Sequence, residues 1–297
     1  MLAPIEEIFC DIDDYCKDWF KGTSAYLLPK VNRQRQRACR LCPSEMITIV
    51  VLFHLSHYRT FKDYYQDCVE KHLKAYFPTL ISYNRFVERM SSIFTPLLGY
   101  LLTCRGKETG FYYVDSTKLE VCHNRRIARH KTFAGIAERG KTSMGWFFGT
   151  KLHLVINHLG ELMSCCLTKG NVSDIQLLEQ LFKNLEGLGA GDKGYLSKKK
   201  EENLLQKGLR FITKVRRNMK EKSLSAFETF FLGQRGLVET VIEQLKSICH
   251  IQHTRHRNPD NFVINLLSGL VAYMLKPRKP ALQFDRMAKY PMLLTSS

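Results

Sequence analysis

The hydrophobic and polar positions of the first hundred residues repeat with the spacing of helices. The first predicted helix follows Pro43 and has Ser44 as its expected N-cap. Two further helices are predicted over residues 61–73 and 85–102, separated by a polar, proline-containing turn. We therefore expect an all-helical N-terminal domain, residues 1–105.

Polar residues open the third of these helices. Asn84 and Arg85 follow the turn directly, which is the arrangement of a helix-turn-helix that places its second helix in the major groove of DNA. Any three-helix bundle shows the same pattern, so DNA recognition by this segment and a purely structural role both stay open.

From residue 106 the pattern changes to short aromatic and β-branched runs that end at turns. Strands are predicted over residues 111–115, 146–157, 162–168, 187–190 and 210–215, and helices over residues 171–185, 197–206 and 235–250. A strand meander followed by crossover helices indicates an α/β fold, a mixed five-stranded sheet flanked by helices, over residues 106–275. The polar stretch 125–141 is predicted to be a loop, and residues 276–297 a C-terminal tail.

The charge balance indicates the partner. Forty-five Lys and Arg against 28 Asp and Glu give a net charge of +17, and the basic residues gather in short clusters. Two of these clusters contain the pairs Arg125 with Arg126 and Arg216 with Arg217. Such a surface attracts the phosphates of double-stranded DNA. The longest apolar stretches are too short to cross a bilayer, so no membrane partner is expected.

The ten cysteines are scattered through apolar stretches of a chain with no evident signal peptide. Cys39 and Cys42 form one C-x-x-C pair, but a zinc site needs a second pair at ligand spacing, and the sequence offers none. Reduced thiols and a cytoplasmic protein are therefore expected.

Three acidic residues sit where chemistry is expected. Asp115 ends the first predicted strand, and Asp192 follows the apolar run of the fourth. Ligands collect at strand ends in α/β sheets, so the two carboxylates should face one another. On the helix over residues 235–250, Arg235, Glu239 and Glu243 share one polar face that could cover this site.

Converging carboxylates repel one another unless a cation neutralises them. Oxygen-only ligands suit Mg²⁺ or Mn²⁺, and two such ions can activate a water or a 3′-hydroxyl for attack on a phosphodiester. The structural alternative is that Asp115 and Asp192 are turn acids and that Arg235 with Glu239 is an ordinary helix ion pair.

Three motifs give the sequence a family resemblance: YVDST at residues 113–117, GDKGY at 191–195, and RGLVE at 235–239 with Lys246 seven residues after the glutamate. The last is similar to the R-x3-E-x6-K signature of DDE transposases, and the chain resembles the nine-eight-two group of bacterial insertion sequences. That resemblance implies an RNase H-like catalytic domain behind a helical DNA-binding region. It also implies Glu239, rather than Glu243, as the third acid. Leu232 stands where related signatures often have tyrosine.

The expected function is metal-dependent strand cleavage and strand transfer at the terminal inverted repeats of an insertion sequence. The protein would act as a dimer or higher oligomer on DNA, associated with the bacterial nucleoid. Arg235 and Lys246 are expected to bind phosphates near the cut, and Lys151 and His153 share a strand face that could point to the same pocket. Asn171 is a possible N-cap for the helix over residues 171–185. A nuclease or junction resolvase, and a non-catalytic basic DNA-binding protein, remain alternatives.

Overall fold

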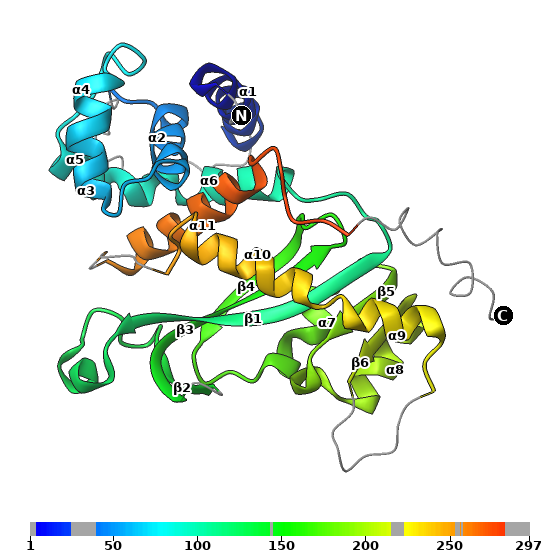
Figure 1. Cartoon of the computed structure of the whole chain (residues 1–297). Coiled ribbons are helices and arrows are strands. Elements are labelled where there is room, and N and C mark those ends of the chain that lie inside the picture. The colour runs from blue at the N-terminus through cyan, green and yellow to red at the C-terminus, as the bar shows by residue number, and fades with distance from the viewer. Residues whose placement is uncertain are drawn as a thin grey trace. The chain divides into compact units, whose positions relative to one another are not determined.

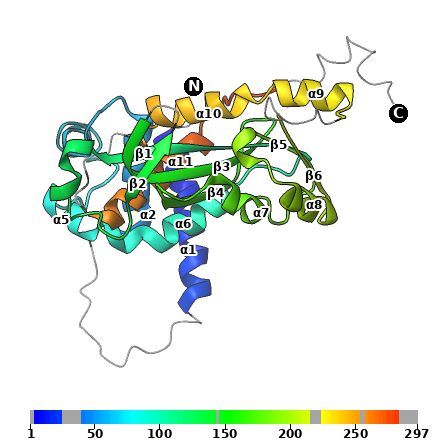
Figure 2. The same cartoon turned by 90° about the horizontal axis from the view of Figure 1, so that it is seen from below.

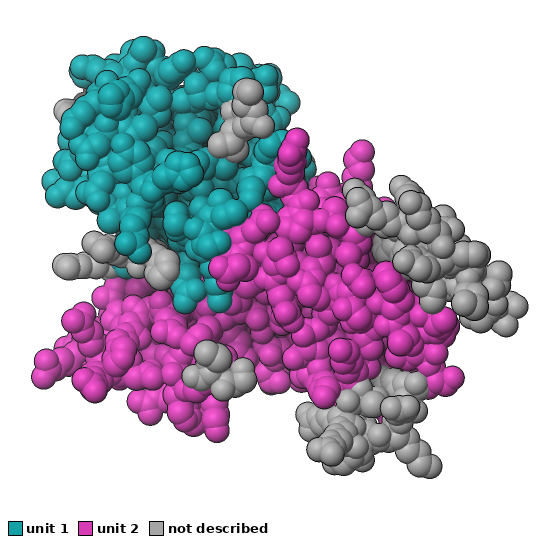
Figure 3. Space-filling model, viewed as in Figure 1, with its two compact units in different colours: residues 1–104, 245–277 teal, residues 105–244, 278–297 magenta. Residues whose placement is uncertain are grey.

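The computed structural model describes residues 4–24, 40–142, 145–214, 223–252, 256 and 258–282. The chain divides into two compact units (Figure 3). Unit 1 combines residues 1–104 with 245–277, and unit 2 combines residues 105–244 with 278–297. The N-terminal helices therefore pack with a late segment of the chain that the sequence pattern places after the sheet.

Unit 1 is built from helices. They are α1 (Ile5–Ser24), α2 (Pro43–Leu55), α3 (Phe61–Asp63), the π-helix η1 (Tyr64–Val69), α4 (Glu70–His72), α5 (Tyr83–Arg89), the 3₁₀-helix η2 (Met90–Ile93), α6 (Phe94–Thr103) and α11 (Pro259–Met274). α11 packs against α2 and α6, and its middle is buried on every side. That burial explains its largely apolar sequence.

Two helix details differ from the sequence prediction. The N-cap of α2 is Cys42, whose sulfur accepts from the Glu45 amide at 3.5 Å, while the hydroxyl of Ser44 donates to Asp13 at 2.6 Å. The helix predicted over residues 85–102 is broken into α5, η2 and α6. Pro96 lies in the first turn of α6 and has no amide hydrogen to continue the ladder backwards, which favours the 3₁₀ turn before it.

Unit 2 contains a six-stranded mixed sheet with the order β2–β3–β1–β5–β6, and β4 also pairs with β3. The strands are β1 (Phe111–Cys122), β2 (Glu138–Thr142), β3 (Gly145–Asn157), β4 (Leu162–Lys169), β5 (Gly187–Gly191) and β6 (Leu209–Thr213). β1, β5 and β6 run parallel, and the other pairs are antiparallel. The fold is thus the predicted mixed α/β class, with one strand more than the predicted five.

The additional strand is β2, within the stretch 125–141 that the sequence predicts to be a loop. It pairs with the start of β3, and β4 continues along the same edge of β3. Gly140 and Gly170 let the two strands meet, since a Cβ on Gly140 would lie 2.1 Å from the Gly170 carbonyl oxygen. The same stretch also contains the short helix η3 (Asn124–Arg129). A short polar edge strand lacks the alternation that identifies strands in sequence.

Helices cover both faces of this sheet. Figure 2 shows α9 (Ala226–Gly233) and the start of α10 (Gly236–Ser247) on one side, with α7 (Leu178–Leu181) and α8 (Lys198–Gln206) on the other. Figure 1 gives their order along the chain. The helix predicted over residues 171–185 is shorter than expected, because it begins as the 3₁₀-helix η4 (Asp174–Leu177) and ends with α7. Asn171 therefore precedes the helix without capping it.

The two faces of β1 have different partners. Tyr112 and Val114 join the apolar cluster under α7 and α8. On the other face, the ring of Tyr113 stacks on Phe231 of α9 at 4.5 Å, and its hydroxyl donates to the Phe231 carbonyl oxygen at 3.0 Å. Alternation along β1 thus assigns odd positions to the α9 side and even positions to the α7 side.

The described ranges contain no helix long and apolar enough to cross a membrane. The nine cysteines that the structure describes are free thiols, and Cys39 lies outside the described residues. Of the predicted tail, residues 276–282 are described, and the Leu282 amide donates to the His158 carbonyl oxygen at 2.8 Å.

Candidate active site

The register of β1 with β5 determines where the first two acids lie. Tyr113 pairs with Ala190 in parallel register, so Asp115 and Asp192 each follow two residues later. β5 ends at Gly191, whereas β1 continues to Cys122. Asp115 is therefore inside a strand and not at its end, and the open edge beside it exists because β5 stops.

Asp192 leaves the sheet at this edge. It is the N-cap of the short 3₁₀-helix η5 (Lys193–Tyr195), and its Oδ1 accepts from the Gly194 amide at 2.6 Å. The turn-acid role that the sequence left open is thus present. It occupies one carboxylate oxygen and leaves the other available for a ligand.

The third acid comes from the helix that covers the odd-numbered face of β1. Glu239 lies in the first turn of α10. Arg235, just before this helix, places Nη2 at 2.6 Å from Glu239 Oε1 and Nη1 at 3.7 Å from Asp115 Oδ2. The guanidinium therefore links the two carboxylates. Glu239 stays 56% exposed, which leaves its side chain free to turn.

The electrostatics of Asp115 also depend on the other two acids. Burial raises its pKa to about 6 from an ordinary 3.8. The Ser116 amide and Arg235 lower this pKa, whereas the charges of Asp192 and Glu239 raise it. A cation bound beside Asp115, in the field of two further carboxylates, would therefore favour its ionised form.

The donor chemistry fits a hard divalent cation, since all three groups offer oxygen. Across the described residues, however, no three His, Cys, Asp or Glu side chains stand close enough together to form a ligand set as they are. Binding would require the exposed Glu239 to turn from Arg235 toward the β1–β5 edge. Glu243 lies one turn further along α10 and is also exposed, but only Glu239 shares Arg235 with Asp115 in the contacts described.

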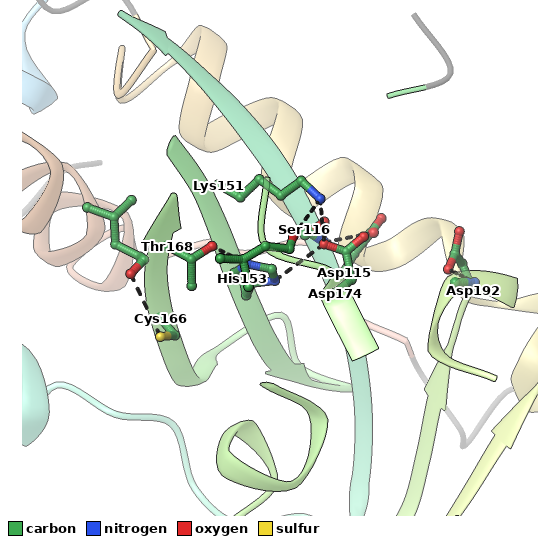
Figure 4. A network of polar contacts seen from close by, with 11 residues as sticks. Asp115, Ser116, Lys151, His153, Cys166, Thr168, Asp174 and Asp192 are labelled. Carbon is green, nitrogen blue, oxygen red and sulfur yellow. Dashed lines mark hydrogen bonds and ion pairs between the residues drawn. The ribbon is translucent and has the colours of Figure 1, made fainter. Parts of the chain in front are cut away.

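Lys151 and His153 occupy the other face of the sheet. In the β1–β3 register, His153 pairs with Ser116 and Lys151 with Lys118, so their side chains lie on the α7 side. Both contact Asp174, with Lys151 Nζ at 3.2 Å and His153 Nδ1 at 3.7 Å from its Oδ1 (Figure 4). The strand parity therefore places the Lys151 and His153 side chains on the opposite face of the sheet from Asp115, and their contact with DNA stays a prediction.

The remaining DNA-binding candidates are dispersed. Arg125 and Arg126 are exposed on η3, in unit 2. Asn84 and Arg85 are exposed on α5 in unit 1, where Arg85 pairs with Glu88 at 3.0 Å. Lys246 lies in the last turn of α10. Arg216 and Arg217 are outside the described residues.

Sequence reasoning missed two polar residues beside the site. They are Ser116 and Asp174, to which the sequence analysis gives no role. The parity of Ser116 with Tyr112 and Val114, which makes it the first polar residue after two buried apolar ones on that face, is the signal that could have revealed the first. Nothing local in the sequence distinguishes Asp174 from a helix-start acid.

Comparison with known proteins identifies the family of the chain. A family model described as a transposase DDE domain matches residues 105–259, more than half of the chain. The chain therefore belongs to the DDE transposase family. A search of curated proteins found no match. Among solved structures, a piggyBac transposase synaptic complex with hairpin DNA aligns with 98% of this chain and 78% of its own, at 12% identity and a TM-score of 0.47.

Proposed function

We propose that this protein is the transposase of a bacterial insertion sequence, which cleaves DNA at its terminal inverted repeats and joins the ends to a target. Asp115, Asp192 and Glu239 are the proposed catalytic residues and the ligands of Mg²⁺ or Mn²⁺, in a two-ion site. The observation that carries this proposal is the parallel register of β1 and β5, which places Asp115 beside the end of β5 where Asp192 follows, with Glu239 linked to Asp115 through Arg235.

The proposed role of each side chain follows from its position in the fold. When bound, the metal ions supply activation of a water or 3′-hydroxyl and stabilisation of the leaving oxygen. Asp115 is held by the rigid centre of the sheet and by the Ser116 amide, which donates to its Oδ1 at 2.8 Å. Glu239 is exposed and adjustable. Arg235, once separated from the carboxylates, is placed to bind a phosphate of the cleaved strand.

The wider assignment rests on the family and on charge. The sheet of unit 2 is proposed to be an RNase H-like catalytic domain, and the helices of unit 1 a DNA-binding region that uses Asn84 and Arg85. Lys246, Arg125 and Arg126 are proposed phosphate contacts, consistent with the net charge of +17. A dimer or larger assembly in the bacterial cytoplasm, at the nucleoid, would bring two element ends together.

Cleavage of DNA that carries the element's own ends tests the proposal. We expect Mg²⁺-dependent nicking that Asp115→Asn, Asp192→Asn and Glu239→Gln each reduce by about a hundredfold or more, since each removes a charged ligand worth several kcal/mol to the transition state. DNA affinity, measured in Ca²⁺ or EDTA, should change only a few-fold. Glu243→Gln is the matched control on the same helix and should retain activity. Full activity of any of the first three removes that residue from the site.

The alternative enzyme, a nuclease or resolvase on the same fold, cuts DNA without joining it. Pre-cut ends offered with a target plasmid separate the two, because only a transposase yields joined products. Cleavage that persists in EDTA, or no cleavage with any divalent metal, would favour the basic DNA-binding protein without catalysis.

A further inference from the structure

A partly buried polar cluster lies on the face of the sheet that the three acids do not use. We call it the Asp174 cluster, and its members are Ser116, Lys151, His153, Thr168 and Asp174 (Figure 4). It continues the face that carries Tyr112 and Val114, where the neighbouring residues form an apolar core. Polar side chains thus replace apolar ones at the level of the proposed active site.

The contacts of the cluster converge on one carboxylate oxygen. Asp174 Oδ1 accepts from the Ser116 hydroxyl at 2.9 Å and from Lys151 Nζ at 3.2 Å, and His153 Nδ1 lies 3.7 Å away. Lys151 Nζ also donates to the Val172 carbonyl oxygen at 3.0 Å. The fully buried His153 ring is held at its far nitrogen by the hydroxyl of Thr168, at 2.9 Å. Asp174 is therefore held by hydrogen bonds from Ser116 of β1 and Lys151 of β3.

Ser116 connects this cluster to the proposed catalytic residue. Its hydroxyl is bound by Asp174, and its backbone amide donates to Asp115 Oδ1 at 2.8 Å. One residue is thus held on the α7 side of the sheet while its amide holds a carboxylate that belongs to the α9 side. Any rotation of the Ser116 peptide would move the hydrogen-bond donor of Asp115.

We infer that Ser116 and Asp174 are positioning residues, which act from the opposite face of the sheet to fix the orientation of the Asp115 carboxylate for metal binding. This inference rests on the proposed function. Its physical basis is that partners behind a metal ligand restrict the ligand's orientation and raise metal affinity. The Lys151–Asp174 ion pair is only partly buried and adds little net stability, so its presence beside Asp115 favours a role in geometry.

The decisive variant is Ser116→Ala, which removes the hydroxyl link and keeps both the Ser116 amide and the Lys151–Asp174 ion pair. Ser116→Thr restores the hydroxyl on a strand that tolerates β-branching. Ser164→Ala is the matched control, since the Ser164 hydroxyl donates to the Leu181 carbonyl oxygen at 2.6 Å, on the same face of the sheet but with no described link to Asp115. Asp174→Asn tests the acceptor itself.

Two readouts are needed, binding of Mn²⁺ to the full-length protein by electron paramagnetic resonance and the Mg²⁺ concentration for half-maximal DNA cleavage. Ser116→Ala and Asp174→Asn should weaken Mn²⁺ binding about tenfold and raise the Mg²⁺ requirement similarly. Ser116→Thr should recover most of the Mn²⁺ affinity and most of the wild-type Mg²⁺ requirement. Ser164→Ala should leave both quantities unchanged. Thermal unfolding should shift equally for the two alanine variants.

The two possible failures are distinguishable with Asp115→Asn as reference. If that variant loses Mn²⁺ binding while Ser116→Ala binds Mn²⁺ like Ser164→Ala, the positioning role is overturned and the proposed function stands. If Asp115→Asn binds Mn²⁺ as well as the wild type, the metal site itself is wrong, and the role of Ser116 falls with it.

Discussion

The backbone of Tyr113 is paired with that of Ala190 in the parallel ladder of β1 and β5, and each residue stands two positions before an acid. Paired residues of neighbouring strands point to the same face, so this register directs Asp115 and Asp192 toward the side on which Tyr113 contacts α9. α10 follows α9 directly and carries Glu239 to that side. A register shifted by one residue would separate the two acids by the thickness of the sheet.

The stability of the metal-free protein should depend on pH through Asp115. Its pKa is about 6 in the folded state and near 3.8 when unfolded, so the folded state retains a proton that the unfolded state loses between these values. The contribution of this retained proton to the free energy of unfolding is complete below about pH 4. It is lost as the pH rises through 6. Relative to Asp115→Asn, we expect the free energy of unfolding in EDTA to fall by up to about 3 kcal/mol across this interval. Urea denaturation at several pH values measures it, and a pH-independent difference would contradict the prediction.

Arg235 should compete with divalent metal for the same carboxylates. Arg235→Gln removes the cation between Asp115 and Glu239, and we expect a loss of about 1 kcal/mol in EDTA. Because the guanidinium no longer has to be displaced, Mg²⁺ should raise the Tm of this variant more than that of the wild type. The Mg²⁺-induced rise in the Tm of Arg235→Lys, which keeps the charge, should lie between those of the wild type and Arg235→Gln. Equal Mg²⁺-induced shifts in all three proteins would show that Arg235 and the metal do not share ligands.

Gly191 should tolerate no side chain. A Cβ there would lie 2.8 Å from Phe211 Cζ and 3.0 Å from Val114 Cγ1, in the core just before Asp192. We expect Gly191→Ala to cost about 1–3 kcal/mol of stability and to reduce metal-dependent cleavage by displacing Asp192. Gly22→Ala in α1, where a Cβ would meet nothing within 4 Å, should instead stabilise by about 0.5–1 kcal/mol. Calorimetry of both variants checks the contrast, and an unchanged Tm for Gly191→Ala would refute the packing argument.

DNA affinity should fall steeply with salt, because bound phosphates release counterions. Arg125→Ala and Arg126→Ala should each weaken binding and reduce the slope of log K against log salt by about one. Arg210→Gln removes the same charge from a side chain already paired with Glu228, and it should leave the slope unchanged. Fluorescence anisotropy over a range of KCl concentrations gives these slopes. A flat dependence for the wild type would argue against DNA as the partner.

Much of the secondary structure follows from local pattern. The alternating run over residues 146–157 is read correctly from sequence and becomes β3, most of which is buried. β2 was missed because its five residues have no apolar alternation and become a strand only beside β3.

The sequence by itself determined the class of fold, the basic surface and, through the motifs around Asp115, Asp192 and Glu239, the family. These depend on residue types at fixed spacing. Only the tertiary structure decided which face each side chain occupies: Asp115 on one side of β1, and Ser116, with Lys151 and His153, on the other. Pairing between strands distant in the chain sets that register, and its energy comes from burial and hydrogen bonds that no local window of sequence contains.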